Sequence, residues 1–387
     1  MEKMKVLAPL DPAFEPIYRG LEAFAARAAE GPEIRIAVER NDGLVATHDM
    51  RILPEGEDDA LSLRMVERMV KSMLWVYGGF RVTIAGSKAV YEGVKEQYRE
   101  GGERAFDANF MAHVYEHAFE VCYAATPAEA PQRKDASAPI GRHLDGCRIG
   151  FDAGGSDRKV SAVINGESVY SEEVVWFPKT QSDPSYHFDG IVSAMKTAAS
   201  KMPRVDAIGV SSAGVYINNH TMSASLFLKV SPEDYEKYVK DIYIRAAKEI
   251  GDVPLTVCND GDVTALAGAM SLGEDGILGI AMGTSEAGGY VDMKGNITGW
   301  LNELAFVPCD LAPDAMVDEW SGDIGCGVKY FSQDAVIKLA PAAGIELDPA
   351  LSPAEKLKVV QGKMEQGDAG ARAIYETIGV YLGYTLA

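Results

Sequence analysis

The chain has 387 residues, which is long enough for two or three domains. Of these residues 47% are hydrophobic and 24% are charged, a composition typical of globular proteins. With 57 acidic against 37 basic side chains, its net charge of -20 disfavours nucleic acid and anionic membranes as partners. The five scattered cysteines favour reduced thiols, and no stretch has the apolar length of a signal peptide or membrane span. We therefore expect a cytoplasmic protein that binds small molecules or other subunits.

Residues 1–124 are predicted to form a small α/β accessory domain. EIRIAVER and LVATHDMRI alternate apolar and polar residues around Asn41-Asp42-Gly43, which predicts a β-hairpin. Apolar residues then share one helical face up to Tyr77, FRVTIAG predicts a strand, and KAVYEGVKEQYRE predicts a helix. No function for this domain follows from its sequence.

The segment HVYEH, from His113 to His117, matches the H-x-x-E-H pattern of some zinc proteases. A pattern with three fixed positions arises often by chance, no third ligand is evident, and the AFEVCYAA that follows predicts a strand. Histidines without a metal are therefore the favoured interpretation.

Residues 125–146 are rich in Ala, Pro and small polar residues and are predicted to be a linker. From Cys147 onward strands alternate with helices, which predicts an α/β domain. We expect its first lobe over residues 147–258 and its second over 259–387.

The new domain opens on CRIGFDAGGSDRKVSAVING, a strand, a glycine-rich turn and a second strand. Glycines at a strand end let the backbone approach a ligand closely, and their N–H groups with the hydroxyl of Ser156 would suit a phosphate. A tight β-turn would have the same sequence, so both interpretations stay open.

A second motif, VCNDGDVTALAGAMSLG, places Asp260 where a strand meets a helix. Reacting side chains are common at such positions in open α/β sheets. Asn and Asp also favour helix N-caps, and capping is the better explanation of this segment taken alone.

A third motif, GILGIAMGTSEAGGYVDMKGNITG, repeats the strand–glycine–strand design of the first, with Gly283-Thr284-Ser285 in its turn. Two such loops facing each other across a cleft could hold the phosphates of one nucleotide. The order of the two loops, with Asp260 between them, is the most informative feature of the sequence.

In this order the motifs resemble the ROK family of sugar kinases and repressors, within the actin-like ATPase superfamily. The family's D-x-G-G-T loop matches Asp152 to Ser156, its N-D-A-N-A-A-A-L-A segment resembles NDGDVTALA, and its G-T-G-x-G-G-G loop resembles GTSEAGG. Its G-E-x-G-H segment would fall on Asn302 to Phe306 and its G-C-L-E on Gly325 to Val328. The resemblance implies an α/β, ribonuclease H-like, two-lobe fold and ATP-dependent phosphorylation of a sugar.

The resemblance also implies roles for single residues. Asp260 would be the general base, Asp152 would place Mg²⁺ through water, and ATP and Mg²⁺ would be the cofactors. The substrate would contact Asn259, Glu303 and Gly214, and the phosphates would contact Gly154, Gly155, Ser156, Gly283, Thr284 and Ser285.

Departures from the family pattern concern zinc and the sugar. The family's zinc ligands are the His of G-E-x-G-H and three cysteines of C-x-C-G-x-x-G-C, and here Phe306, Ser321 and Asp323 replace all but Cys326, so no zinc site is expected. The same histidine and the glutamate of G-C-L-E usually touch the sugar, and here they are Phe306 and Val328. An apolar wall facing a deoxy or acylated position is one hypothesis.

The last residues, AGARAIYETIGVYLGYTLA, predict a helix. In the resembling family a further strand and an adenosine-contacting loop follow, so we expect a C-terminally incomplete second lobe. Alternatives to the kinase are a sugar-sensing regulator without catalytic activity and a degenerate binding module. The acceptor, the phosphorylated hydroxyl and whether the chain forms a homodimer stay open.

Overall fold

The computed structural model describes residues 5–387, which form two compact units. The first, here the terminal unit, contains residues 5–136, 281–287 and 300–387. The second, here the central unit, contains residues 137–280 and 288–299. The four-part division expected from the sequence stays a prediction.

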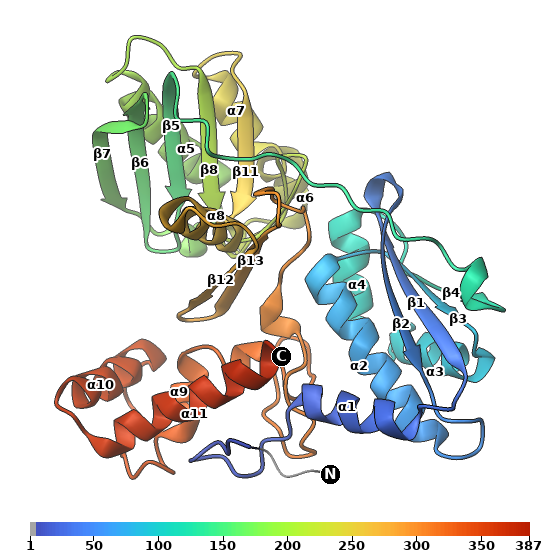
Figure 1. The fold of residues 1–387 in the computed structure, drawn as a ribbon. Coiled ribbons are helices and arrows are strands. Elements are labelled where there is room, and N and C mark those ends of the chain that lie inside the picture. Colours follow the sequence, from blue (N-terminus) through green and yellow to red (C-terminus); the bar gives the residue numbers. More distant parts are fainter. Residues whose placement is uncertain (1–4) are drawn as a thin grey trace. The chain divides into compact units, whose positions relative to one another are not determined.

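The central unit is built on a five-stranded sheet in the order β11-β8-β5-β6-β7 (Figure 1). Strands β5, β8 and β11 are parallel, while β6 runs antiparallel to both of its neighbours. This order and direction are those of the ribonuclease H-like sheet, so the predicted fold class is confirmed. The strands are β5 (Cys147–Ala153), β6 (Asp157–Ile164), β7 (Glu167–Val175), β8 (Ala207–Ser212) and β11 (Leu255–Asn259).

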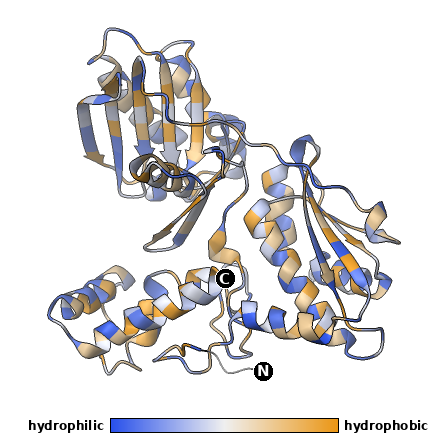
Figure 2. Cartoon of the chain, in the orientation of Figure 1, coloured by the Kyte–Doolittle hydropathy of each residue, from blue (hydrophilic) through white to orange (hydrophobic). Residues whose placement is uncertain are grey.

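Side chains along β5 alternate between buried and half-buried, and none is fully exposed, because helices cover both faces of the sheet. Helices α5 (Pro184–Ala199) and α7 (Ile242–Lys248) pack together on one face, and α8 (Asp260–Leu272) covers the other (Figure 1). Figure 2 shows hydrophobic residues along the central strands. Phe151 of β5 and Val210 of β8 are both buried. The shorter elements are β9 (Val215–Ile217), β10 (His220–Ser223) and α6 (Pro232–Asp234).

The N-terminal part of the terminal unit confirms the elements predicted there. Its sheet has the order β2-β1-β3-β4, with the predicted hairpin between β1 and β2. Helix α2 packs on β1, and α3 packs on β3 and β4. The elements are α1 (Ile17–Arg27), β1 (Glu33–Arg40), β2 (Leu44–Arg51), α2 (Asp59–Tyr77), β3 (Arg81–Ala85), α3 (Lys88–Tyr98), α4 (Ala105–Tyr115) and β4 (Glu120–Ala124).

The HVYEH segment does not place its histidines on one helical face. Helix α4 ends at Tyr115, and Glu116 adopts a left-handed conformation with φ 56°. The ring of His117 stacks on Phe80, with 4.1 Å between the ring centroids. Within residues 5–387 no group of three or more His, Cys, Asp or Glu side chains is placed to hold a metal ion.

The C-terminal part of the terminal unit shares its core with Ala8 and Phe14 from the N-terminal segment. Its helices are α9 (Gln333–Leu339), α10 (Pro353–Glu365) and α11 (Ala369–Thr385), the last being the predicted C-terminal helix. The ring of Phe14 packs on Tyr381 of α11, with centroids 4.6 Å apart. The amide of Leu10 donates to the hydroxyl of Thr377 at 3.2 Å. Residues from both ends of the chain thus stabilise one another.

Strands β12 (Ile277–Met282) and β13 (Glu286–Val291) form a two-stranded ladder. Residues 281–287, which include the turn between them, belong to the terminal unit. None of the helices in residues 5–387 has the length and apolar character needed to cross a membrane.

Candidate active site

The candidate residues of the central unit lie at one edge of its sheet. In the strand register, Ala153 of β5 and Asn259 of β11 are both paired with Ser212 of β8. The three parallel strands therefore end side by side. The segments that follow them carry Gly154 to Ser156, Gly214, and Asp260. The carboxyl edge of parallel strands is where open α/β sheets bind their ligands.

Asn259, and not Asp260, caps helix α8. The side-chain oxygen of Asn259 accepts a hydrogen bond from the amide of Gly261 at 2.7 Å, and its side-chain nitrogen donates to the carbonyl of Gly214 at 2.8 Å. Asn259 thus connects the ends of β8 and β11. The capping explanation considered from the sequence applies to Asn259, and Asp260 is the first residue of the helix.

Electrostatics make the Asp260 carboxylate a stronger base than an exposed aspartate. Burial raises the pKa of Asp260, the backbone N–H of Gly261 opposes this shift, and the negative charge of Asp152 raises the pKa further. The two carboxylates therefore repel one another at the sheet edge. A cation bound there would relieve that repulsion.

The predicted phosphate loop of residues 154–156 is held by the indole of Trp176. The ring nitrogen of Trp176 donates to the carbonyl of Gly154 at 2.8 Å, and the backbone amide of Trp176 donates to the carbonyl of Ser156 at 3.1 Å. A Cβ added to Gly155 would lie 2.9 Å from Cε and 3.1 Å from Nζ of Lys179. The side chain of Lys179 therefore lies over the turn, which places a positive charge beside the backbone N–H groups.

The second predicted phosphate loop is an exposed turn in the terminal unit. Within Gly283-Thr284-Ser285, the amide of Gly283 donates to the carbonyl of Ser285 at 2.9 Å, and the amide of Gln333 donates to the carbonyl of Gly283 at 2.9 Å. The later glycines have another role in the central unit. A Cβ on Gly261 would lie 2.2 Å from the carbonyl oxygen of Gly288, so only glycines let α8 approach β13 this closely.

Glu303 lies in the terminal unit, where helix α2 holds its backbone. The amide of Glu303 donates to the carbonyl of Trp75 at 3.0 Å, and the ring of Trp75 stacks on Phe306 with centroids 4.2 Å apart. The indole N–H of Trp75 donates to Asp107 at 2.7 Å. The Glu303 side chain itself is half-buried. Phe306, at the position where the resembling family has a histidine, packs on an aromatic ring.

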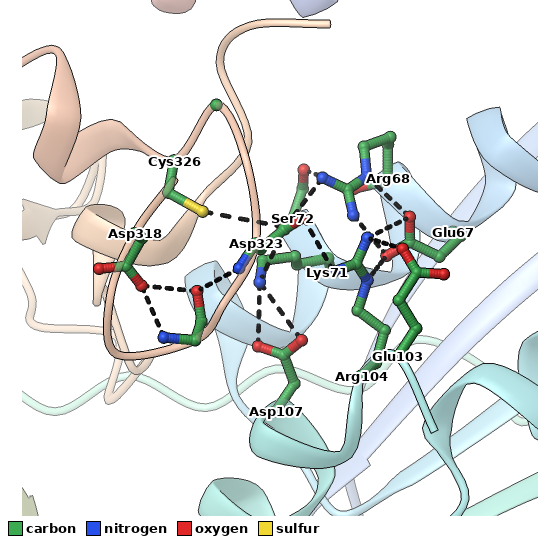
Figure 3. Close-up of polar contacts among 12 residues, drawn as sticks. Glu67, Arg68, Lys71, Ser72, Glu103, Arg104, Asp107, Asp318, Asp323 and Cys326 are labelled. Atoms are coloured by element: carbon green, nitrogen blue, oxygen red, sulfur yellow. Dashed lines mark hydrogen bonds and ion pairs between the residues drawn. The ribbon is translucent and has the colours of Figure 1, made fainter. Parts of the chain in front are cut away.

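A buried cluster of charges, here the ion cluster, anchors the loop that carries the other replaced zinc ligands (Figure 3). Asp323 accepts from Arg68 at 2.9 Å, from Lys71 at 3.1 Å and from Arg104 at 2.8 Å. Burial alone would raise the pKa of Asp323, but the three cations hold it well below its usual range. Its members are Glu67, Arg68, Lys71, Arg104, Asp107 and Asp323, all buried.

The sequence analysis missed two residues that the structure brings to the candidate loops. Lys179 lies in an unremarkable WFPKTQ segment, and only its packing on Gly155 reveals it. Glu286 was visible as a charged residue in the variable position of the G-T-G-x-G-G-G pattern, directly after Ser285. A charged residue at a position where the resembling pattern leads from a turn into an apolar strand is the signal that could have been followed.

Neither a protein-family model nor a curated protein matches this sequence. Several solved structures do. A ROK hexokinase from Thermus thermophilus has 17% identity and a TM-score of 0.47, over 62% of this chain and 76% of that one. A ROK-family transcriptional regulator has 18% identity and a TM-score of 0.46, over 63% of this chain and 62% of that one. A glucokinase from Parabacteroides distasonis has 16% identity and a TM-score of 0.42, over 63% and 69%.

Proposed function

We propose that this protein phosphorylates a sugar or sugar derivative with ATP and Mg²⁺, with Asp260 as the general base. The observation that carries the proposal is the sheet edge of the central unit. There Asp260 begins a helix that Asn259 caps, beside Asp152 and a glycine turn. This arrangement provides a basic carboxylate next to backbone donors for phosphate. The proposal assigns the phosphates to the turns at 154–156 and 283–285, and the sugar to Asn259, Gly214 and Glu303.

Asp152 suits a magnesium ion because its carboxylate is partly exposed, its oxygens are hard ligands, and Asp260 adds a second negative charge nearby. Mg²⁺ when bound would neutralise charge on the transferring phosphoryl group. Lys159 lies 3.9 Å from Asp152 and 2.6 Å from Asp157, so this edge already carries both signs of charge. Asp152 would hold the ion through water.

The chain's own residues would do the rest by positioning and proton transfer. Asp260 would accept the proton of the attacking sugar hydroxyl, and its raised pKa strengthens it as a base. The N–H groups of Gly154 to Ser156 would bind phosphate oxygens, because a fixed donor turn needs no reorganisation during the reaction. Asn259 and Glu303 would orient the sugar for in-line attack.

A noncatalytic sugar-sensing protein is the second candidate. It is favoured by Phe306 and Val328, which stand where the resembling family places two polar sugar contacts, and by the packing of Phe306 on Trp75. Such a protein would bind a sugar without turning it over.

The test is ADP release from ATP and Mg²⁺ over a panel of hexoses, N-acetylhexosamines and polyols. We expect sugar-dependent release that Asp260→Asn reduces by at least about 100-fold, because a positioned base contributes roughly 10²–10⁴-fold. Asp252→Asn, an exposed carboxylate of the same unit, is the matched control and should leave the rate unchanged. Sugar binding without turnover would support the sensing function instead.

A further inference from the structure

Glu286, at the start of β13, is a buried acid without a partner in the structure. Its side chain follows the candidate phosphate turn directly, and the residue is 6% exposed. Its Oε2 atom is buried and accepts or donates no hydrogen bond. In the described part of the chain, no basic side chain pairs with it. Such a group costs stability, so its presence calls for an explanation.

The neighbours of Glu286 belong to the segments that carry Glu303 and Val328. A Cβ on Gly327 would lie 2.6 Å from Oε2 of Glu286 and 2.5 Å from the carbonyl oxygen of Leu304. The carboxyl group thus fills the space that a side chain at 327 would need. The charge of Glu303 adds to the burial that raises the pKa of Glu286, and Glu286 adds to the burial that raises the pKa of Cys309.

Burial and the charge of Glu303 raise the pKa of Glu286 to about 8. At neutral pH this carboxyl is therefore mostly protonated, and it can donate a hydrogen bond that an ordinary glutamate cannot. The acid of the resembling G-C-L-E pattern is replaced here by Val328, one residue from the glycine against which Glu286 packs. The neutral carboxyl of Glu286 thus packs against Gly327, next in the chain to Val328, where the resembling pattern has a charged acid.

We propose that Glu286 is a specificity-determining residue of the sugar site, whose carboxyl group donates a hydrogen bond to an acyl carbonyl oxygen of the substrate. The assignment rests on the proposed function. An acyl carbonyl accepts hydrogen bonds only, so it matches a protonated acid, and its alkyl group suits Val328 and Phe306 better than a hydroxyl would. A deoxy position offers no acceptor, so Glu286 distinguishes the two substrates that an apolar wall alone would admit.

Calorimetric titration of sugars into the intact chain, without nucleotide, tests this assignment. The ligands are N-acetylglucosamine, N-acetylmannosamine, their parent hexoses and 2-deoxyglucose. The wild type should bind an N-acetylhexosamine more tightly than its parent. Glu286→Leu should weaken that binding about tenfold or more, with little effect on the parent hexose, while Glu286→Gln, which keeps an N–H donor, should retain most of it.

Two further readouts make the result decisive. Glu286→Leu should raise the melting temperature, because it removes an unpartnered buried polar atom, and this shows that lost binding is not lost folding. Glu303→Gln should weaken the parent sugars as well as the acylated ones, because it removes a proposed sugar contact together with the charge that raises the pKa of Glu286. The assignment is overturned if Glu286→Leu binds the acylated sugar as tightly as the wild type, weakens all sugars equally, or if the wild type prefers the parent hexose. A wild type that binds no sugar overturns the proposed function as well.

Discussion

The buried carboxyl of Glu286 should also affect the stability of the chain when no ligand is bound. Its pKa is about 8 in the folded chain against an ordinary 4.5, so the folded state binds more protons between these values. The unfolding free energy should therefore fall as pH rises from about 5 to 8. Glu286→Gln removes this dependence. The unfolding free energy of the variant should therefore increase relative to that of the wild type between pH 5 and pH 8, by on the order of 3 kcal/mol. Urea unfolding at pH 5 and pH 8 measures the gain, and an equal difference at both pH values would contradict the account.

Lys179 is expected to contribute to the binding of the nucleotide. Because its side chain lies over Gly155, Lys179→Met should raise KM for ATP about tenfold and leave sugar binding unchanged. Lys179→Arg should recover part of the loss. Lys248, an exposed lysine on α7, is the matched control. If Lys179→Met and Lys248→Met have the same KM for ATP, the phosphate loop does not use Lys179.

The sequence predicted Asp152, Asp260 and the two glycine loops because chemistry at strand ends leaves a local pattern. It did not predict which of Asn259 and Asp260 caps α8, since either residue suits an N-cap. It could not reveal Lys179, because nothing in WFPKTQ encodes the fold-back of this segment on Gly155 through Trp176. Contacts between segments distant in sequence have no local signature.

At the scale of elements, the ion cluster is the contact that fixes the loop around Asp323 to α2 and α4. Asp323→Asn should lower the unfolding free energy by about 3–5 kcal/mol, because it leaves three buried cations short of an anion. The depressed pKa of Asp323 means that its contribution is fully present above the pKa of the unfolded chain, about 3.9, and decreases as pH falls from there toward the lower pKa of the folded chain.

Urea unfolding at pH 7 and near pH 3 measures this contribution. Glu103→Gln is the control, since Glu103 bonds Arg104 at 3.2 Å from the exposed rim of the same cluster and should matter little. Equal losses from the two variants would show that the buried geometry contributes nothing special.

Helix α2 shows what sequence patterns predict and what they miss. Its apolar stripe predicted a helix up to Tyr77, and the helix in the structure runs from Asp59 to Tyr77. Its charged residues Glu67, Arg68 and Lys71 would ordinarily face solvent, and here all three are buried. Only the partners from α4 and from the Asp323 loop make that burial favourable. The sequence showed that Phe306 and Asp323 differ from the zinc ligands of the resembling pattern, whereas the aromatic stack and the ion cluster at these positions could not be predicted.

At the scale of the molecule, the fold class followed from the alternation of strands and helices, and the strand order of the central sheet confirms it. The packing of Phe14 on Tyr381, and the ties between α2 and the loops around Glu303 and Asp323, were not predictable. They join residues several hundred positions apart. The terminal unit is therefore held together by both ends of the chain.

In the proposed reaction, the γ-phosphoryl group of ATP is transferred to a sugar hydroxyl whose proton Asp260 accepts. The most direct test is mass spectrometry of the sugars after incubation with ATP and Mg²⁺, with the wild type and Asp260→Asn compared. We predict a sugar heavier by one phosphoryl group from the wild type and none above background from the variant. A variant that forms the sugar phosphate as fast as the wild type, or a wild type that releases ADP and free phosphate alone, would contradict the account.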